Sequence, residues 1–128
     1  MQESGYQETG QKQQLILVTG GAYQGQAAFA AELAGMADGG EPWTVWEDLH
    51  LRIAEMMRQG EDPREEIRRL QQEHSRLIVT VNELGCGIVP IDAFDREWRE
   101  VTGRICCDLA KRAQAVYRMT CGISTRLK

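Results

Sequence analysis

The sequence of 128 residues has no apolar run long enough to cross a membrane, and it has no excess of positive charge. A membrane-spanning helix needs about 20 consecutive apolar residues, and no run here approaches that length. Lysine and arginine number 15 against 19 aspartate and glutamate residues, so the net charge is −4. Because nucleic-acid binders usually carry a basic excess, we expect neither a membrane span nor a nucleic-acid partner.

Metal-binding and disulfide patterns are also missing. The four cysteines form no C-x-x-C pair, and neither His50 nor His74 stands at zinc-finger spacing from them. We therefore expect reduced thiols, with Cys106 and Cys107 packed as small apolar side chains on a long helix. His50 is expected to be a partly exposed side chain on another helix.

Residues 1–14 are polar and rich in glutamine, and they lack the apolar stretch of a secretory signal. We expect them to form a disordered leader, with the cytoplasm as the location of the protein. The rest of the chain, residues 15–128, has the length and composition of a single globular domain.

Along this domain, short β-prone runs alternate with helical patterns. The runs predict strands at residues 15–19, 43–46, 77–81 and 116–121. Helical spacing predicts helices at residues 27–37, 49–59, 62–74 and 92–115, the last two capped by Asp62 and Asp92. Residues 123–128 are expected to be a short tail after Gly122. This alternation predicts an α/β fold with a mostly parallel sheet.

The turn between the first strand and the first helix has part of the phosphate-loop pattern G-x-x-x-x-G-K-S/T. Its glycines allow backbone N–H groups to point at phosphate oxygens. The predicted nucleotide-binding residues are Gly20, Gly21, Ala22, Tyr23, Gln24, Gly25, Gln26 and Ala27. Gln26 stands at the lysine position and Ala27 at the hydroxyl position, so the phosphate-binding charge and the magnesium ligand are missing. A glycine-rich turn without any ligand is the alternative.

Four segments together resemble one enzyme family. Residues 81–90 read V-N-E-L-G-C-G-I-V-P, residues 98–104 read W-R-E-V-T-G-R, and residues 17–22 read L-V-T-G-G-A. With the end of the chain, from residue 115 to 128, they are similar in order and context to the adenosylcobinamide kinase / adenosylcobinamide-phosphate guanylyltransferase family. The likeness covers residues 15–37 and 77–128 well and the middle of the chain poorly.

The resemblance implies a P-loop-type three-layer domain, commonly assembled as an oligomer, that acts in cobalamin biosynthesis. Enzymes of the family phosphorylate adenosylcobinamide with a nucleoside triphosphate and transfer GMP through a guanylylated histidine. The implied ligands are GTP or ATP with Mg²⁺ and a cobinamide-type corrinoid, and no other cofactor is expected. The implied substrate loop contains Asn82, Glu83, Gly85 and Gly87, for which a polar loop cap is the alternative.

Several departures from the family pattern bear on catalysis. The segment that carries the guanylylated histidine is absent, and neither His50 nor His74 takes its place, so we assign no catalytic residue. Glu47 follows the second strand, where the family has an acidic residue, and it is the candidate Mg²⁺ ligand. The alternative is that Glu47 and Asp48 form an acidic pair that stabilises a helix N-terminus.

Three functions remain open from the sequence. The first is a catalytically impaired family member that retains weak nucleotide or corrinoid binding. The second is a reduced but active adenosylcobinamide kinase that takes its cation from Arg52, Arg99 or Arg104. The third is a non-catalytic interaction or regulatory subunit.

Overall fold

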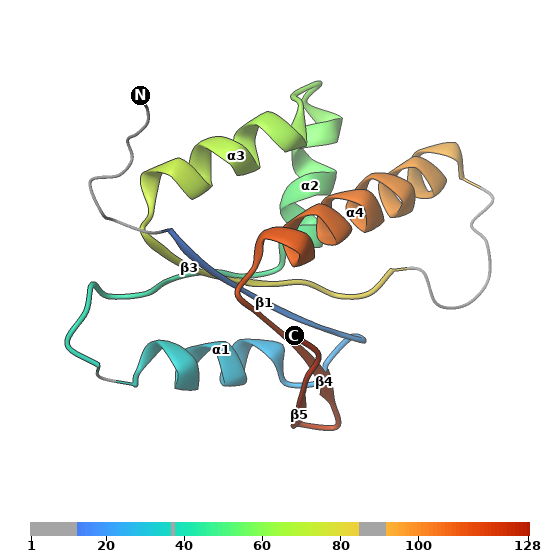
Figure 1. The fold of residues 1–128 in the computed structure, drawn as a ribbon. Helices are drawn as coiled ribbons and strands as arrows, with labels where there is room; N and C mark the ends of the chain where they lie inside the picture. The colour runs from blue at the N-terminus through green and yellow to red at the C-terminus, as the bar shows by residue number, and fades with distance from the viewer. Residues whose placement is uncertain (1–12, 37, 85–91) are drawn as a thin grey trace.

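The computed structural model describes residues 13–36, 38–84 and 92–128 (Figure 1). Within these ranges the elements are, in order, β1 (Gln14–Gly20), α1 (Gln26–Ala34), β2 (Thr44–Trp46), α2 (Leu49–Arg58), α3 (Pro63–Glu73), β3 (Arg76–Thr80), α4 (Ala93–Arg112), β4 (Ala115–Thr120) and β5 (Ile123–Arg126). None of the helices in the described part of the chain is long and apolar enough to cross a membrane.

One five-stranded sheet with the order β2-β3-β1-β4-β5 organises the molecule. The first four strands are parallel, and β5 runs antiparallel to β4. β1 is central because Ile16 pairs with Ile78 of β3 on one side and with Ala115 of β4 on the other. The predicted α/β class with a mostly parallel sheet is confirmed.

Helices cover both faces of the sheet, with α1 on one side and α2, α3 and α4 on the other (Figure 1). Successive residues of a strand point to opposite faces, so Leu15 and Leu17 face α2–α4 while Ile16 and Val18 face α1. All four are buried, which explains why β1 reads as a continuous apolar run. The result is a three-layer domain.

The helices follow the predicted positions, but two of them end earlier. α1 ends at Ala34, and the N–H of Gly35 closes its last turn on the carbonyl oxygens of Ala31 and Glu32. α4 ends at Arg112 rather than near residue 115. Ala115 belongs to β4, where it pairs with Ile16, so sheet pairing prevails over the helix propensity of alanine.

The predicted tail after Gly122 is wrong, because residues 123–126 form β5. Cys121 and Gly122 make a two-residue hairpin turn in which both residues have positive φ, 52° and 79°. Such a turn matches the twist of an antiparallel pair. A cysteine at its first position is uncommon, so the sequence pattern does not reveal this hairpin.

The leader was predicted over residues 1–14, of which residues 1–12 lie outside the described residues. Gln14 already belongs to β1, and the side chain of Gln13 donates a hydrogen bond to the carbonyl oxygen of Gln71 at 2.7 Å. The ordered domain therefore includes at least two residues of the predicted leader.

Candidate functional site

The loop between β1 and α1 lies where the strand order reverses. α1 follows β1 on one face of the sheet, and α4 follows β3, the neighbour of β1, on the opposite face. In open α/β sheets this arrangement leaves a crevice at the carboxyl ends of the two strands, and ligands bind there. The sheet therefore places the predicted phosphate loop at the expected ligand position.

Gly20 and Gly25 are required by packing whether or not a ligand binds. A Cβ atom on Gly20 would lie 2.7 Å from the carbonyl oxygen of Met119. Gly25 has a φ of 101°, and a Cβ atom there would lie 3.3 Å from the Cα atom of Gly122. At the tip of the loop, Tyr23 also has a positive φ, 59°, and its side chain is fully exposed.

Gln26, at the lysine position, is buried and fills the inside of the loop. Its Nε2 atom donates to the carbonyl oxygen of Gly21 at 2.8 Å. Two further acceptors at the end of β3 are within reach, Asn82 Oδ1 at 3.3 Å and the Val81 carbonyl oxygen at 3.4 Å. The amide has only two N–H donors for these three oxygens. It thus ties the loop to β3 without bringing any charge.

Gln24 ties the same loop to the β4–β5 hairpin. Its side-chain Oε1 atom accepts a hydrogen bond from the N–H of Cys121 at 2.6 Å, and its carbonyl oxygen accepts one from the N–H of Gly122 at 2.9 Å. Ala22 and Ala27 are exposed, and neither side chain carries a ligand atom. Two glutamines therefore hold the loop in place: Gln26 connects it to the end of β3, and Gln24 connects it to the β4–β5 hairpin.

Glu83 forms an ion pair that the sequence analysis did not identify. Arg118 of β4 donates to both carboxylate oxygens of Glu83, at 2.9 and 3.1 Å. Thr19 Oγ1 is 3.5 Å from the same carboxylate, and the N–H of Glu83 donates to the carbonyl oxygen of Gly20 at 2.7 Å. Because β4 lies next to β1, Arg118 brings a cation to the strand that leads into the loop. No motif marks Arg118; only the strand order reveals it.

His50 is buried, so the expectation of a partly exposed side chain is wrong. Its Nδ1 atom accepts a hydrogen bond from the N–H of Asn82 at 3.1 Å, and its carbonyl oxygen accepts one from Trp98 Nε1 at 2.7 Å. Burial lowers the pKa of His50 below its usual value, which favours the neutral ring. His50 thus supports the predicted substrate loop at Asn82, while Gly85 and Gly87 lie outside the described residues.

Glu47, the candidate Mg²⁺ ligand, is exposed at the end of β2, and its carbonyl oxygen accepts a hydrogen bond from Arg52 Nε at 3.0 Å. Asp48 has a positive φ, 58°, and its N–H donates to Thr80 Oγ1, whereas its side chain makes no cap bond to α2. Among the described residues, no three His, Cys, Asp or Glu side chains group closely enough to hold a metal ion. The role of Glu47 stays a prediction.

The three arginines considered as a replacement cation have other positions. The Arg52 guanidinium lies over the Trp46 ring, 4.7 Å from its centroid. Arg99 and Arg104 both line a groove between α3 and α4, where Arg104 pairs with Glu100. None of these contacts involves residues 20–27.

The two adjacent cysteines of α4 differ from each other. Cys106 packs against the core, and burial raises the pKa of its thiol to about 12. Cys107 is exposed, so the expectation that both thiols pack as apolar side chains holds for Cys106 only.

The fold and the loop define the class of the protein: an α/β domain of the P-loop type, with an open sheet and a glycine-rich turn at its switch point. Residues 43–127, well over half of the chain, match the family model described as cobinamide kinase / cobinamide phosphate guanyltransferase. The chain belongs to this family. The match includes the middle segment, where we saw little likeness, and it does not include the loop at residues 20–27.

Two curated proteins are similar to part of the chain. Both are named bifunctional adenosylcobalamin biosynthesis protein CobU, one from Escherichia coli (strain K12) and one from Salmonella typhimurium (strain LT2). Each is 33% identical over 54 residues, which make up 42% of this chain. The matched segment spans only 30% of the length of either relative.

Proposed function

We propose that this protein is a catalytically impaired member of its family, which binds a nucleotide or a cobinamide-type corrinoid weakly and transfers neither phosphate nor GMP. Buried Gln26 carries the proposal. Its neutral amide occupies the interior of the loop, where its Nε2 atom is held by the carbonyl oxygen of Gly21.

The cost of this replacement can be estimated. A hydrogen bond to a charged group contributes about 1.5–3 kcal/mol, and Gln26 offers phosphate at best a neutral one. Removing a preorganised donor that stabilises transition-state charge lowers the rate by roughly 10²–10³. Ala27 adds a second loss, because it has no oxygen to hold magnesium. Phosphoryl transfer depends mainly on positioning and electrostatics, so the two losses fall on the same step.

The missing guanylylated histidine supports the loss of GMP transfer. His50 is the histidine nearest to the predicted substrate loop, but it is buried and its Nδ1 atom is occupied by the N–H of Asn82. A nucleophile must reach the phosphorus atom of a bound nucleotide, and a ring held in the core is poorly suited to that role.

The test is a calorimetric titration with GTP and Mg²⁺, followed by a coupled assay of GTP and ATP turnover with cobinamide. We expect dissociation constants near the millimolar range, which corresponds to about −4 kcal/mol, and no cobinamide-dependent turnover. Micromolar binding with turnover would overturn the proposal.

The same assay addresses the alternative of an active kinase, which one observation favours. Arg118 supplies a cation beside β1, next to the loop, although Glu83 holds it in a bidentate pair. If Arg118 replaced the lysine, turnover would be measurable and Arg118→Ala would abolish it. Arg118→Lys would then retain part of the turnover, because the charge is kept.

A further inference from the structure

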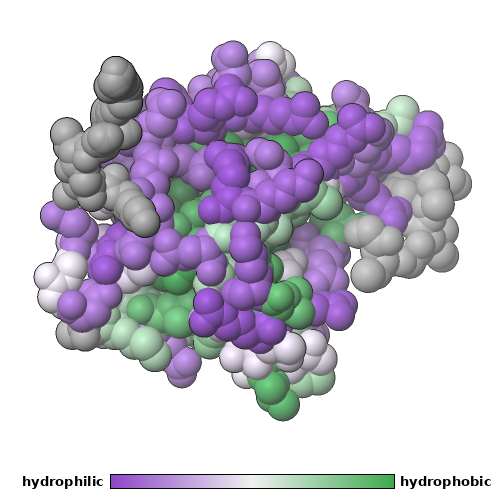
Figure 2. Space-filling view, viewed as in Figure 1, coloured by the Kyte–Doolittle hydropathy of each residue, from purple (hydrophilic) through white to green (hydrophobic). Residues whose placement is uncertain are grey.

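A groove runs between α3 and α4, on the side of the sheet opposite α1 (Figure 1). Its volume is about 900 Å³. Ile67 of α3 and Ile105 of α4 line it and are nearly fully buried, so its floor is apolar. Gly103 opens it further, since a Cβ atom there would meet nothing within 4 Å. Figure 2 shows hydrophilic residues over α3 and α4, with apolar residues visible in the hollow between them.

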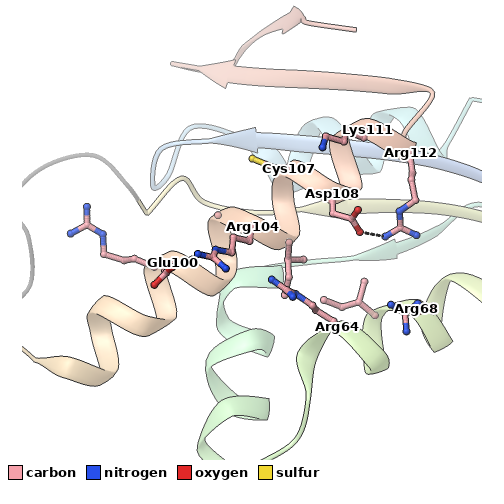
Figure 3. A pocket seen from close by; sticks show the side chains of 12 residues that line it. Arg64, Arg68, Glu100, Arg104, Cys107, Asp108, Lys111 and Arg112 are labelled. Atoms are coloured by element: carbon pink, nitrogen blue, oxygen red, sulfur yellow. Dashed lines mark hydrogen bonds and ion pairs between the residues drawn. The ribbon is translucent and has the colours of Figure 1, made fainter.

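The walls of the groove are strongly basic, although the protein as a whole carries a net charge of −4. Among the described residues that line the groove, Glu100 and Asp108 are the acidic ones. The basic lining residues are Arg64, Arg68, Arg99, Arg104, Lys111 and Arg112. Figure 3 shows Arg64 and Arg68 on α3 and the other labelled charged residues on α4. The groove is thus a local positive region on an acidic protein.

Both acidic residues are already engaged. Glu100 pairs with Arg104 at 2.5 Å, and Asp108 pairs with Arg112 at 2.8 Å, each one helical turn along α4. Within the described part of the chain, no carboxylate lies within ion-pair distance of Arg64, Arg68 or Lys111. These three cations are therefore available to a ligand from outside the chain.

We propose that this groove binds an acidic segment of a partner protein. The spacing of the cations favours a segment over a compact anion. Arg64 and Arg68 lie about 6 Å apart along α3, and Arg104 and Lys111 lie about 10 Å apart along α4, at 1.5 Å per residue. A single phosphate or pyrophosphate needs donors that converge on one point, whereas several glutamate or aspartate side chains can meet charges spread over such lengths.

The apolar floor supports the same partner. Interfaces combine a buried apolar centre with a charged rim, and here the rim is basic around Ile67 and Ile105. The partner is therefore an acidic segment with one or two apolar side chains among its carboxylates. The groove does not include the phosphate loop, so this proposal does not depend on nucleotide or corrinoid binding.

The probe is a fluorescein-labelled peptide of eight glutamates, titrated against the full chain and followed by fluorescence anisotropy. We expect binding that weakens as NaCl is raised, because rim charges are screened. Arg64→Glu/Arg68→Glu should weaken binding by about tenfold, which corresponds to about 1.4 kcal/mol, since two attractions become repulsions. Both side chains are exposed, so the variant should fold; circular dichroism checks this.

The matched control is Arg58→Glu/Arg126→Glu, which changes the net charge equally at two exposed arginines outside the groove. Binding by this control should stay within about twofold of the parent, as expected for changes distant from an interface. If both double variants lose affinity alike, or if the parent shows no binding, the proposal is wrong. Stronger binding of tripolyphosphate or of a single-stranded oligonucleotide would also overturn it, in favour of a different ligand.

Two further variants keep the test informative should the first fail to fold. Gly103→Glu adds a negative charge in open space at the groove and should weaken peptide binding, whereas Gly103→Ala should leave it unchanged.

The thiols give an independent readout. The peptide should slow alkylation of Cys107, which lines the groove, and leave that of exposed Cys121 in the hairpin unaffected. If the peptide slows the alkylation of both thiols equally, or slows neither, it does not bind in the groove.

Discussion

The double substitution Gln26→Lys/Ala27→Ser should restore nucleotide affinity. Three oxygens lie around the Nε2 atom of Gln26, at 2.8, 3.3 and 3.4 Å, and they belong to Gly21, Asn82 and Val81. A lysine ammonium has three N–H donors and no acceptor, so it can donate to two of these oxygens and still donate to a phosphate. The loop therefore already has the surroundings that a lysine needs.

The expected gain follows from the charge. A charged hydrogen bond to phosphate in place of a neutral one contributes about 1.5–3 kcal/mol, which is roughly 10- to 150-fold in the dissociation constant. Serine at position 27 adds an oxygen for magnesium, so part of the gain should disappear when Mg²⁺ is chelated. Calorimetric titration of parent and variant with GTP, with and without Mg²⁺, measures both effects.

The matched control is Gln26→Met, which keeps the length of the side chain and removes its donors. It should gain no affinity, and it should lower the stability of the loop because the carbonyl oxygen of Gly21 loses its partner. If the double variant folds and binds GTP no better than the parent, residues 20–27 do not form a damaged nucleotide site. The ligand-free turn would then be the correct interpretation.

Three further predictions concern stability, measured by chemical denaturation. Gly25→Ala should destabilise the protein by about 1–3 kcal/mol, because a φ of 101° strains any residue with a Cβ atom and Gly122 is close; an unchanged midpoint would refute this. Gly103→Ala should stabilise it by about 0.8–1 kcal/mol through helix propensity, and a loss would mean that the position is not open. The pKa of His50 is lowered below its unfolded value of about 6.5, so the unfolded chain binds more protons and stability should fall as pH drops below that value. In His50→Asn, which keeps an acceptor for the N–H of Asn82, this pH dependence should shrink; an identical pH profile would refute it.

The order of strands and helices could be predicted from the sequence because it depends on local signals, namely apolar runs and helix caps. The apolar run at residues 15–18 fills both faces of β1, and Asp62 and Asp92 cap α3 and α4 as their sequence context indicates. The end of α4 could not be predicted in this way. It depends on Ala115 finding Ile16, a residue far away in the chain, as its partner in the sheet.

The same limit applies to the candidate site. The glycines of the loop and the change at Gln26 follow a motif, so the sequence identified them. Arg118 and the cations of the groove have no motif, since their positions depend on which strand lies beside β1 and which helix faces α4. His50 was predicted to be partly exposed because helical spacing alone does not show that Asn82 and Trp98 donate hydrogen bonds to this residue.

The bonds between Gln24 and the hairpin turn have a consequence for the order of folding. Gln24 and Cys121 are 97 positions apart in the sequence, yet a hydrogen bond joins them, and β1 cannot complete its pairing until β4 lies beside it. Contacts of such long range form late, because the chain entropy of closing the intervening segment must be overcome first. A loop near the start of the chain therefore reaches its final shape only after β4 and β5 have left the ribosome and docked on the sheet.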